Sequence, residues 1–242
     1  MSALRIGCSG WTYKDWRGPF YPQDLRARDW LGWYATRFDT AEINASFYRL
    51  PAETTVDGWA ERVPAGFLFA WKVSRFITHN KKLKDCAEPV ERVYGRMRRL
   101  GEAGGPALLQ LPPQLRRDDD RLAGFLKLLP KGRHAVEFRH DSWYAPQVFQ
   151  ILADFDAALC ISDHHAAPSP WEVTASWVYL RGHGPGGRYV GRYPPTELKR
   201  WAEAIAGWRA QRRDVYAYFD NDVKSAAPRD ALALKALLEP KG

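Results

Sequence analysis

Short apolar runs alternate with longer amphipathic stretches along the whole chain. Eight such runs recur, at 4–9, 41–44, 67–73, 107–111, 135–138, 158–162, 177–180 and 215–219. Most of them are too short to be helices, and near-continuous apolar runs are typical of strands buried on both faces. The pattern therefore predicts eight buried β-strands.

Helical periodicity fills most of the gaps between these runs. It is visible at 88–100, 119–129, 146–154, 196–209 and 229–238, and an amphipathic stretch precedes the second run. Strands that alternate with helices predict a parallel sheet. Eight such units in 242 residues favour an α/β fold with a single TIM-type (β/α)8 barrel over residues 1–242. An open doubly wound sheet is the alternative.

Polar or charged residues end nearly every apolar run. The carboxyl ends of barrel strands converge on one mouth, where barrel enzymes keep their active sites, so we expect these side chains to meet there. Strand alternation places Glu42 with Asn44, and Glu137 with Arg139, on one face. The alternative is that Glu137 with Arg139, and Lys72 with Glu42, form structural ion pairs. The expected mouth residues are Ser9, Trp11, Glu42, Asn44, Lys72, Gln110, Glu137, Arg139, Arg181, His183, Tyr218, Asp220 and Asn221.

A glycine-rich segment follows the seventh run. Five glycines between 182 and 191 stand among His183, Arg188 and Arg192. Glycines let backbone N–H groups approach a ligand, and the loops after barrel strands seven and eight are frequent phosphate sites. We expect an anionic group there, with Tyr189 and Tyr193 among the aromatic residues that contact the ligand. A flexible solvent loop is the alternative.

Composition narrows the class of protein. The formal net charge is +8, which attracts anions, nucleic acid included, but is also common in proteins that bind none. Three cysteines without a C-x-x-C pair argue against a disulfide scaffold and a structural zinc site, so we expect a cytoplasmic protein. We see no signal-peptide pattern and no apolar run long enough to span a membrane, so we expect no membrane partner.

Metal and cofactor signals are weak. His164, His165 and His183 stand near acidic residues in the sequence, but no H-x-x-x-H or H-E-x-x-H spacing occurs. The serine-nucleophile motif G-x-S-x-G is also absent. We assign no metal ligands, and the sequence leaves any cofactor unknown.

The chain resembles the domain-of-unknown-function 72 family over nearly its whole length. The matching segments are IGCSGWTYKDWRGPFYP, FDTAEINASFYRLP, FLFAWKVSRFITH, LLQLPPQL, AVEFRHDSWY, YLRGHGPGGRYVGRYPPTELKRWAEAI and VYAYFDNDVKSAAPRDALAL. The resemblance implies a TIM-type barrel and supplies no reaction. It singles out most of the mouth residues above, together with Tyr13, Phe47, Tyr48 and Asp222. One departure is Asp230, where the family usually has asparagine.

Three functions remain open at this stage. The first is a hydrolase-like enzyme for a phosphorylated or other anionic substrate. In it, Lys72, Arg139 and Arg181 bind the anion, and Asn44, Gln110 and Tyr218 orient the substrate. Its general acid and base come from Glu42, Glu137 and Asp220. The second is a nucleic-acid-binding or nucleic-acid-processing protein, favoured by the basic charge and by the lysines at 81, 82 and 84. The third is a binding protein that recognises a small metabolite without altering it.

A salt series tests the nucleic-acid hypothesis. If the basic residues contact phosphates, the affinity for single- or double-stranded DNA falls steeply as salt rises, because binding releases condensed counterions. Fluorescence anisotropy between 50 and 200 mM salt, a range in which ~6–10 phosphate contacts lose roughly 10³–10⁵ in affinity, measures this slope. Absence of binding, or a flat slope, contradicts the hypothesis.

Overall fold

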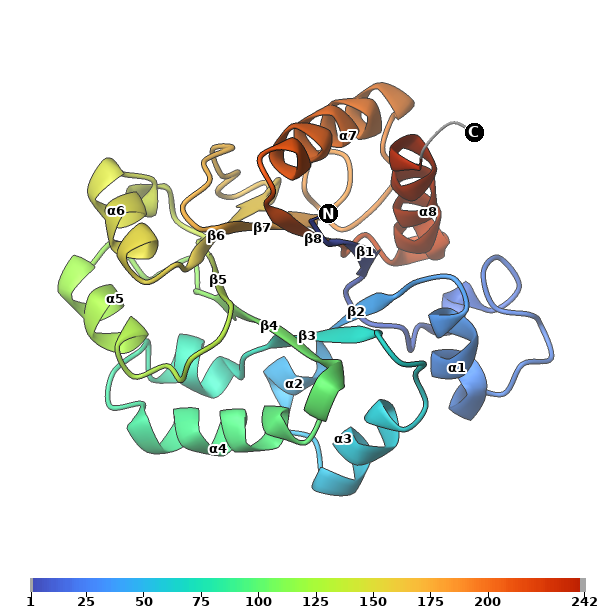
Figure 1. Cartoon of the computed structure of the whole chain (residues 1–242), viewed down its shortest axis with the longest axis horizontal. Coiled ribbons are helices and arrows are strands. Elements are labelled where there is room, and N and C mark those ends of the chain that lie inside the picture. Colours follow the sequence, from blue (N-terminus) through green and yellow to red (C-terminus); the bar gives the residue numbers. More distant parts are fainter. Residues whose placement is uncertain (1, 240–242) are drawn as a thin grey trace.

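The computed structural model describes residues 2–239 and contains a nearly closed barrel of eight parallel strands. The strands neighbour one another in the order β1-β8-β7-β6-β5-β4-β3-β2, and helices surround the ring that they form (Figure 1). The predicted TIM-type barrel is confirmed, and the open-sheet alternative is wrong. The strands are β1 (Leu4–Cys8), β2 (Thr40–Ile43), β3 (Leu68–Lys72), β4 (Gly104–Gln110), β5 (His134–Glu137), β6 (Ala158–Ser162), β7 (Trp177–Gly182) and β8 (Asp214–Phe219).

The helices lie outside this ring. Two of them, α2 and α3, fall between the second and third strands and were not predicted. The first is a single turn, and the second contains two threonines, an aspartate and a glycine, all weak helix formers, with Val56 as its one buried residue. The helices are α1 (Trp30–Ala35), α2 (Ala45–Tyr48), α3 (Glu53–Ala60), α4 (Ala87–Arg98), α5 (Asp119–Leu126), α6 (Pro146–Asp154), α7 (Pro195–Ala210) and α8 (Ala226–Leu238).

Strand alternation divides the apolar residues between two cores. On β8, Val215, Ala217 and Phe219 belong to the larger core between strands and helices. Tyr216 and Tyr218 belong to a smaller core inside the barrel. That inner core combines aromatic residues of β7 and β8 with alanines of β3, β5 and β6. The inward-facing row of a strand therefore leads through packed side chains to a polar residue at the mouth.

The barrel closes between β1 and β2 through a side chain. Beyond one isolated bridge between Ser9 and Glu42, the hydroxyl of Tyr34 joins the two strands: it accepts from the N–H of Cys8 at 2.8 Å and donates to the carbonyl of Thr40 at 3.0 Å. Gly7 makes room for this contact. A Cβ at Gly7 would lie 2.3 Å from the Thr40 carbonyl oxygen and 2.8 Å from the Tyr34 hydroxyl.

No helix within residues 2–239 has both the length and the apolar composition that a membrane crossing requires.

We expect Gly7→Ala to lower the free energy of unfolding by about 1–3 kcal/mol, because the added methyl group forces β1 and β2 apart. Gly32→Ala is the matched control. Gly32 lies on the exposed face of α1 with no atom near its added Cβ, so alanine raises stability there by up to about 1 kcal/mol. Urea unfolding followed by circular dichroism measures both, and equal midpoints for Gly7→Ala and the wild type would contradict the assignment.

Candidate functional site

One guanidinium gathers carboxylates from three strands at the mouth of the barrel. Arg181, at the end of β7, contacts both oxygens of Glu42 at 3.1 and 2.7 Å, Glu137 Oε2 at 3.0 Å and Asp220 Oδ2 at 2.8 Å. The side chains of Arg181, Glu42 and Glu137 are fully buried. The predicted convergence of these residues is therefore present in the structure.

The donors of Arg181 are all used within this cluster. Besides the carboxylates, it contacts Ser9 Oγ at 3.1 Å and His183 Nε2 at 3.1 Å, and a guanidinium has only five N–H groups. Glu42 is equally enclosed, because the hydroxyls of Ser9 and Tyr179 also donate to it. The anion-binding role expected of Arg181 is consequently filled by the protein's own carboxylates.

Arg139 holds Glu137 from the other side. Its guanidinium lies 2.7 Å from Glu137 Oε1 and donates to Gln110 Oε1 at 3.2 Å and to the hydroxyl of Tyr189 at 3.0 Å. Burial alone would raise the pKa of Glu137, but Arg139 and Arg181 outweigh it and hold that pKa well below its usual range. Glu137 is thus a permanent anion at neutral pH, and its contact with Arg139 matches the structural ion pair considered above.

His183 is a neutral imidazole within the same cluster. Its Nε2 lies 3.1 Å from nitrogens of both Arg139 and Arg181, which can only donate, so Nε2 accepts. Its Nδ1 then carries the proton and faces Asp163 Oδ1 at 3.2 Å. Burial, supported by the two guanidiniums, lowers the pKa of His183 well below its usual value.

A cavity of about 550 Å³ opens above the cluster. Five of the predicted residues line it, and they come from four different strand ends and the glycine-rich loop. Sequence reasoning left six further lining residues out of the site, although the resemblance had singled out four of them. The predicted residues are Asn44, Lys72, Gln110, Tyr189 and Asp220, and the others are Tyr13, Asp15, Phe47, Tyr48, Asp222 and Val223.

Lys72 is the cation of the mouth that has no carboxylate partner. Its side chain is buried, and its ammonium nitrogen lies 4.5 Å from the centre of the Phe47 ring. Across residues 2–239, no carboxylate oxygen lies within 4 Å of that nitrogen, and it makes no hydrogen bond. Burial, together with the positive charge of Arg181, lowers the pKa of Lys72 to about 8.

Two buried oxygens of the cavity wall also have no hydrogen-bond partner in the described part of the chain. They are Asn44 Oδ1 and Asp222 Oδ1. Burial and the neighbouring Asp220 raise the pKa of Asp222, and burial raises that of Asp220 in spite of Arg181. An unsatisfied buried polar group costs about 1–3 kcal/mol. A ligand that supplies partners to these groups would recover part of that cost.

Four other predicted residues belong neither to the wall of this cavity nor to the charged cluster beneath it. Tyr218 points into the barrel below it, where its hydroxyl lies 2.7 Å from that of Thr40. Trp11 lines a smaller neighbouring cavity and packs edge-on against Trp59.

The other two, Tyr193 and Asn221, support the loops. The hydroxyl of Tyr193 donates to Asp163 and accepts from the N–H of Gly184. Asn221 Nδ2 donates to the carbonyl of Gly191 at 2.7 Å and to Asp230 Oδ2 at 2.8 Å.

The glycine-rich loop folds back on itself. The N–H of Gly187 donates to the carbonyl of Gly184, and that of Tyr189 to the carbonyl of His183. A Cβ at Gly187 would lie 2.1 Å from a backbone oxygen, so the close approach requires glycine. Arg192 contacts Asp230, the residue that departs from the family pattern. The loop thereby places Tyr189 over the mouth, and these internal bonds occupy N–H groups that were expected to face an anion.

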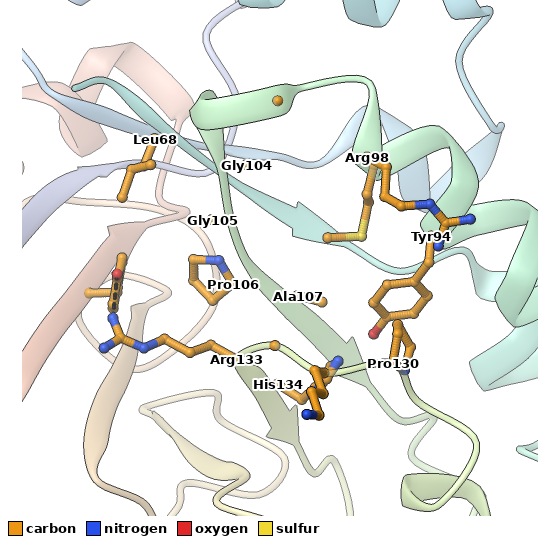
Figure 2. A pocket seen from close by; sticks show the side chains of 15 residues that line it. Leu68, Tyr94, Arg98, Gly104, Gly105, Pro106, Ala107, Pro130, Arg133 and His134 are labelled. Atoms are coloured by element: carbon orange, nitrogen blue, oxygen red, sulfur yellow. Dashed lines mark hydrogen bonds between the residues drawn. The ribbon is translucent and has the colours of Figure 1, made fainter. Parts of the chain in front are cut away.

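A second cavity, of about 440 Å³, lies at the opposite end of the barrel, by the amino ends of β3, β4 and β5. Arg133 reaches one side of it and Tyr94 the other (Figure 2). Arg133 is paired with Asp214 at 2.6 Å, and Arg98 with Glu91 at 2.5 Å. Residues at this end of a barrel usually contribute to stability rather than to catalysis, so we place the candidate active site at the mouth.

Within residues 2–239, no group of three or more histidine, cysteine, aspartate or glutamate side chains is arranged to hold a metal ion.

We expect Arg181→Met to destabilise the protein by about 3–5 kcal/mol, because it leaves buried carboxylates without their cation. The deficit should shrink as the pH falls and the carboxylates take up protons. Arg92→Met, which removes an exposed pair with Glu88, should cost no more than about 0.5 kcal/mol. Urea unfolding between pH 4 and 8 measures both. A deficit for Arg181→Met that equals the control, or grows on acidification, would refute the arrangement.

The chain is similar in sequence to known proteins of two bacteria. The chain is 22% identical to the UPF0759 protein YunF of Bacillus subtilis, over 98% of this chain and 95% of that protein. It is 33% identical to the UPF0759 protein YecE of Escherichia coli, over 46% of this chain and 42% of that protein.

Solved structures extend the comparison to the fold. A DUF72 family protein from Thermotoga maritima superposes with a TM-score of 0.89 at 26% identity, over 98% of this chain and 99% of that one. A second, from Enterococcus faecalis, gives a TM-score of 0.84 at 21% identity, over 99% of both chains. The family model described as "Protein of unknown function DUF72" matches residues 5–242, and the chain therefore belongs to the DUF72 family.

Proposed function

We propose that this protein is an enzyme whose active site is the mouth cavity, with Lys72 and Asp220 as the groups that transfer protons. The observation that carries the proposal is the unpaired Lys72. Three cations reach the mouth, and the guanidiniums of Arg139 and Arg181 are both bound to carboxylates. The amine of Lys72 instead faces the cavity, which it lines together with Asp220.

The environment prepares both groups for proton transfer at neutral pH. Burial lowers the pKa of Lys72 to about 8 and raises that of Asp220. A group whose pKa lies near the working pH serves best as a general acid or base. Arg181 holds Oδ2 of Asp220, whereas Oδ1 has no hydrogen-bond partner within the described residues and is left for a substrate.

Glu42 and Glu137 have a different part in this proposal. Both were expected to act as acid or base, but each is fully enclosed by donors. They fix Arg181, which in turn orients Asp220. We therefore do not assign the hydrolysis by paired carboxylates that the sequence favoured.

The cavity wall favours a small polar substrate without a phosphate group. Asp15, Asp220 and Asp222 contribute acidic groups to it, against the single amine of Lys72. The amides of Asn44 and Gln110 suit hydroxyl or carbonyl groups, and the rings of Phe47, Tyr48 and Tyr189 suit a carbon skeleton. A sugar-like or hydroxy-carbonyl compound meets both requirements, so the anionic substrate expected from the sequence is not retained.

We expect Asp220→Asn to lower kcat by roughly 10²–10⁴, because it removes the proton but keeps the shape of the side chain. Proton NMR of the protein incubated with panels of aldoses, ketoses and polyols identifies a consumed compound and gives the rate. Asp141→Asn is the control, since that carboxylate is exposed beyond β5. Rates unaffected by Asp220→Asn, or no compound bound or consumed, would contradict the proposal.

A further inference from the structure

The geometry points to a covalent step at Lys72, in which its amine forms an imine with the carbonyl carbon of an aldehyde or ketone. This inference rests on the proposed function and names the substrate class of the same site. It goes further than proton transfer, because it makes Lys72 a nucleophile that bonds to the substrate.

The position of Lys72 is fixed from both sides. Its carbonyl oxygen lies 2.6 Å from the hydroxyl of Ser46, which also contacts the carbonyl of Ile43 at 2.8 Å. These contacts tie the single turn of α2 to the ends of β2 and β3. The same turn carries Phe47, whose ring lies beside the amine. The backbone of Lys72 is thus anchored between a strand and a helical turn, and its amine lies against the Phe47 ring of that turn at the cavity wall.

The surroundings raise the fraction of the amine that is neutral. A lysine bound to a carboxylate keeps its proton, whereas this amine has no carboxylate within 4 Å in residues 2–239. Its pKa of about 8 leaves about a tenth of the amine neutral at pH 7. An unperturbed lysine has only about one neutral amine in 2,500 at that pH. Desolvation and a neighbouring cation are the usual means by which proteins activate a lysine for attack on a carbonyl.

The step is balanced without an oxidant or a reductant. The lone pair of Lys72 Nζ attacks the carbonyl carbon, and the carbonyl oxygen takes up a proton to give a carbinolamine. Loss of that oxygen as water, with protons from the amine and from Asp220, forms the C=N bond. Addition of water reverses the sequence and frees the amine. Asp220 lines the same cavity and is suited to deliver and recover the proton.

Reductive trapping tests the inference. The protein of residues 1–242 is incubated with sodium cyanoborohydride and, separately, dihydroxyacetone, glycolaldehyde or glyceraldehyde, and the adducts are located by peptide mass spectrometry. We expect at least one compound to label Lys72 at least tenfold faster than surface lysines such as Lys127. The labelling rate should rise with pH, with its midpoint near 8.

Two variants complete the test. Lys72→Met, which keeps the length and apolar stem of the side chain, should lose the fast adduct, and Lys127→Met should retain it. Circular dichroism of both variants checks the fold. Labelling confined to surface lysines with all three compounds overturns the inference. If Asp220→Asn still abolishes turnover in that case, the proposed function survives without the imine. An adduct on Lys72 without turnover of any compound supports the imine and contradicts the enzyme.

Discussion

The mouth of this barrel depends on the neutralisation of buried charge. Moving a carboxylate or a guanidinium out of water carries a penalty of several kcal/mol, and Arg181 is buried against three carboxylates at once. The arrangement is stable because nearly every lone pair and N–H in it has a partner, and because Arg139 adds a second cation. The cluster is therefore a nearly neutral floor. The groups proposed to react are Lys72, which lies outside the cluster, and Asp220, which belongs to it through Oδ2 alone.

The sequence was sufficient to predict the architecture and the convergence of charges. Eight apolar runs gave eight strands, and the positions of Glu42, Glu137 and Asp220 near the carboxyl ends of their strands brought them together at one end of the barrel. These predictions succeed because strand periodicity and barrel geometry are local rules that apply wherever the run occurs. The one-turn helix α2 was missed because four residues carry no periodicity.

The partners of each charge could not be predicted in the same way. Sequence alone treats Arg181 and Lys72 as equivalent cations at two strand ends. The structure separates them, since Arg181 reaches three carboxylates and Lys72 lies against an aromatic ring. That difference depends on side-chain length and on contacts between residues up to 172 positions apart. Tyr193 and Asn221 stand in the segments that follow β7 and β8, so we expected both at the mouth. Their side chains instead form hydrogen bonds with the loop that follows β7.

The contact of Tyr34 with β1 and β2 has a consequence for the substitutions that the barrel tolerates. The other neighbouring strands are joined by ladders of backbone hydrogen bonds. At this junction the backbone contributes one isolated bridge, and the phenol of a residue on α1 supplies a further link between the two strands. The outer helix is in this sense part of the wall, and another amphipathic helix without tyrosine at that place would lose this link.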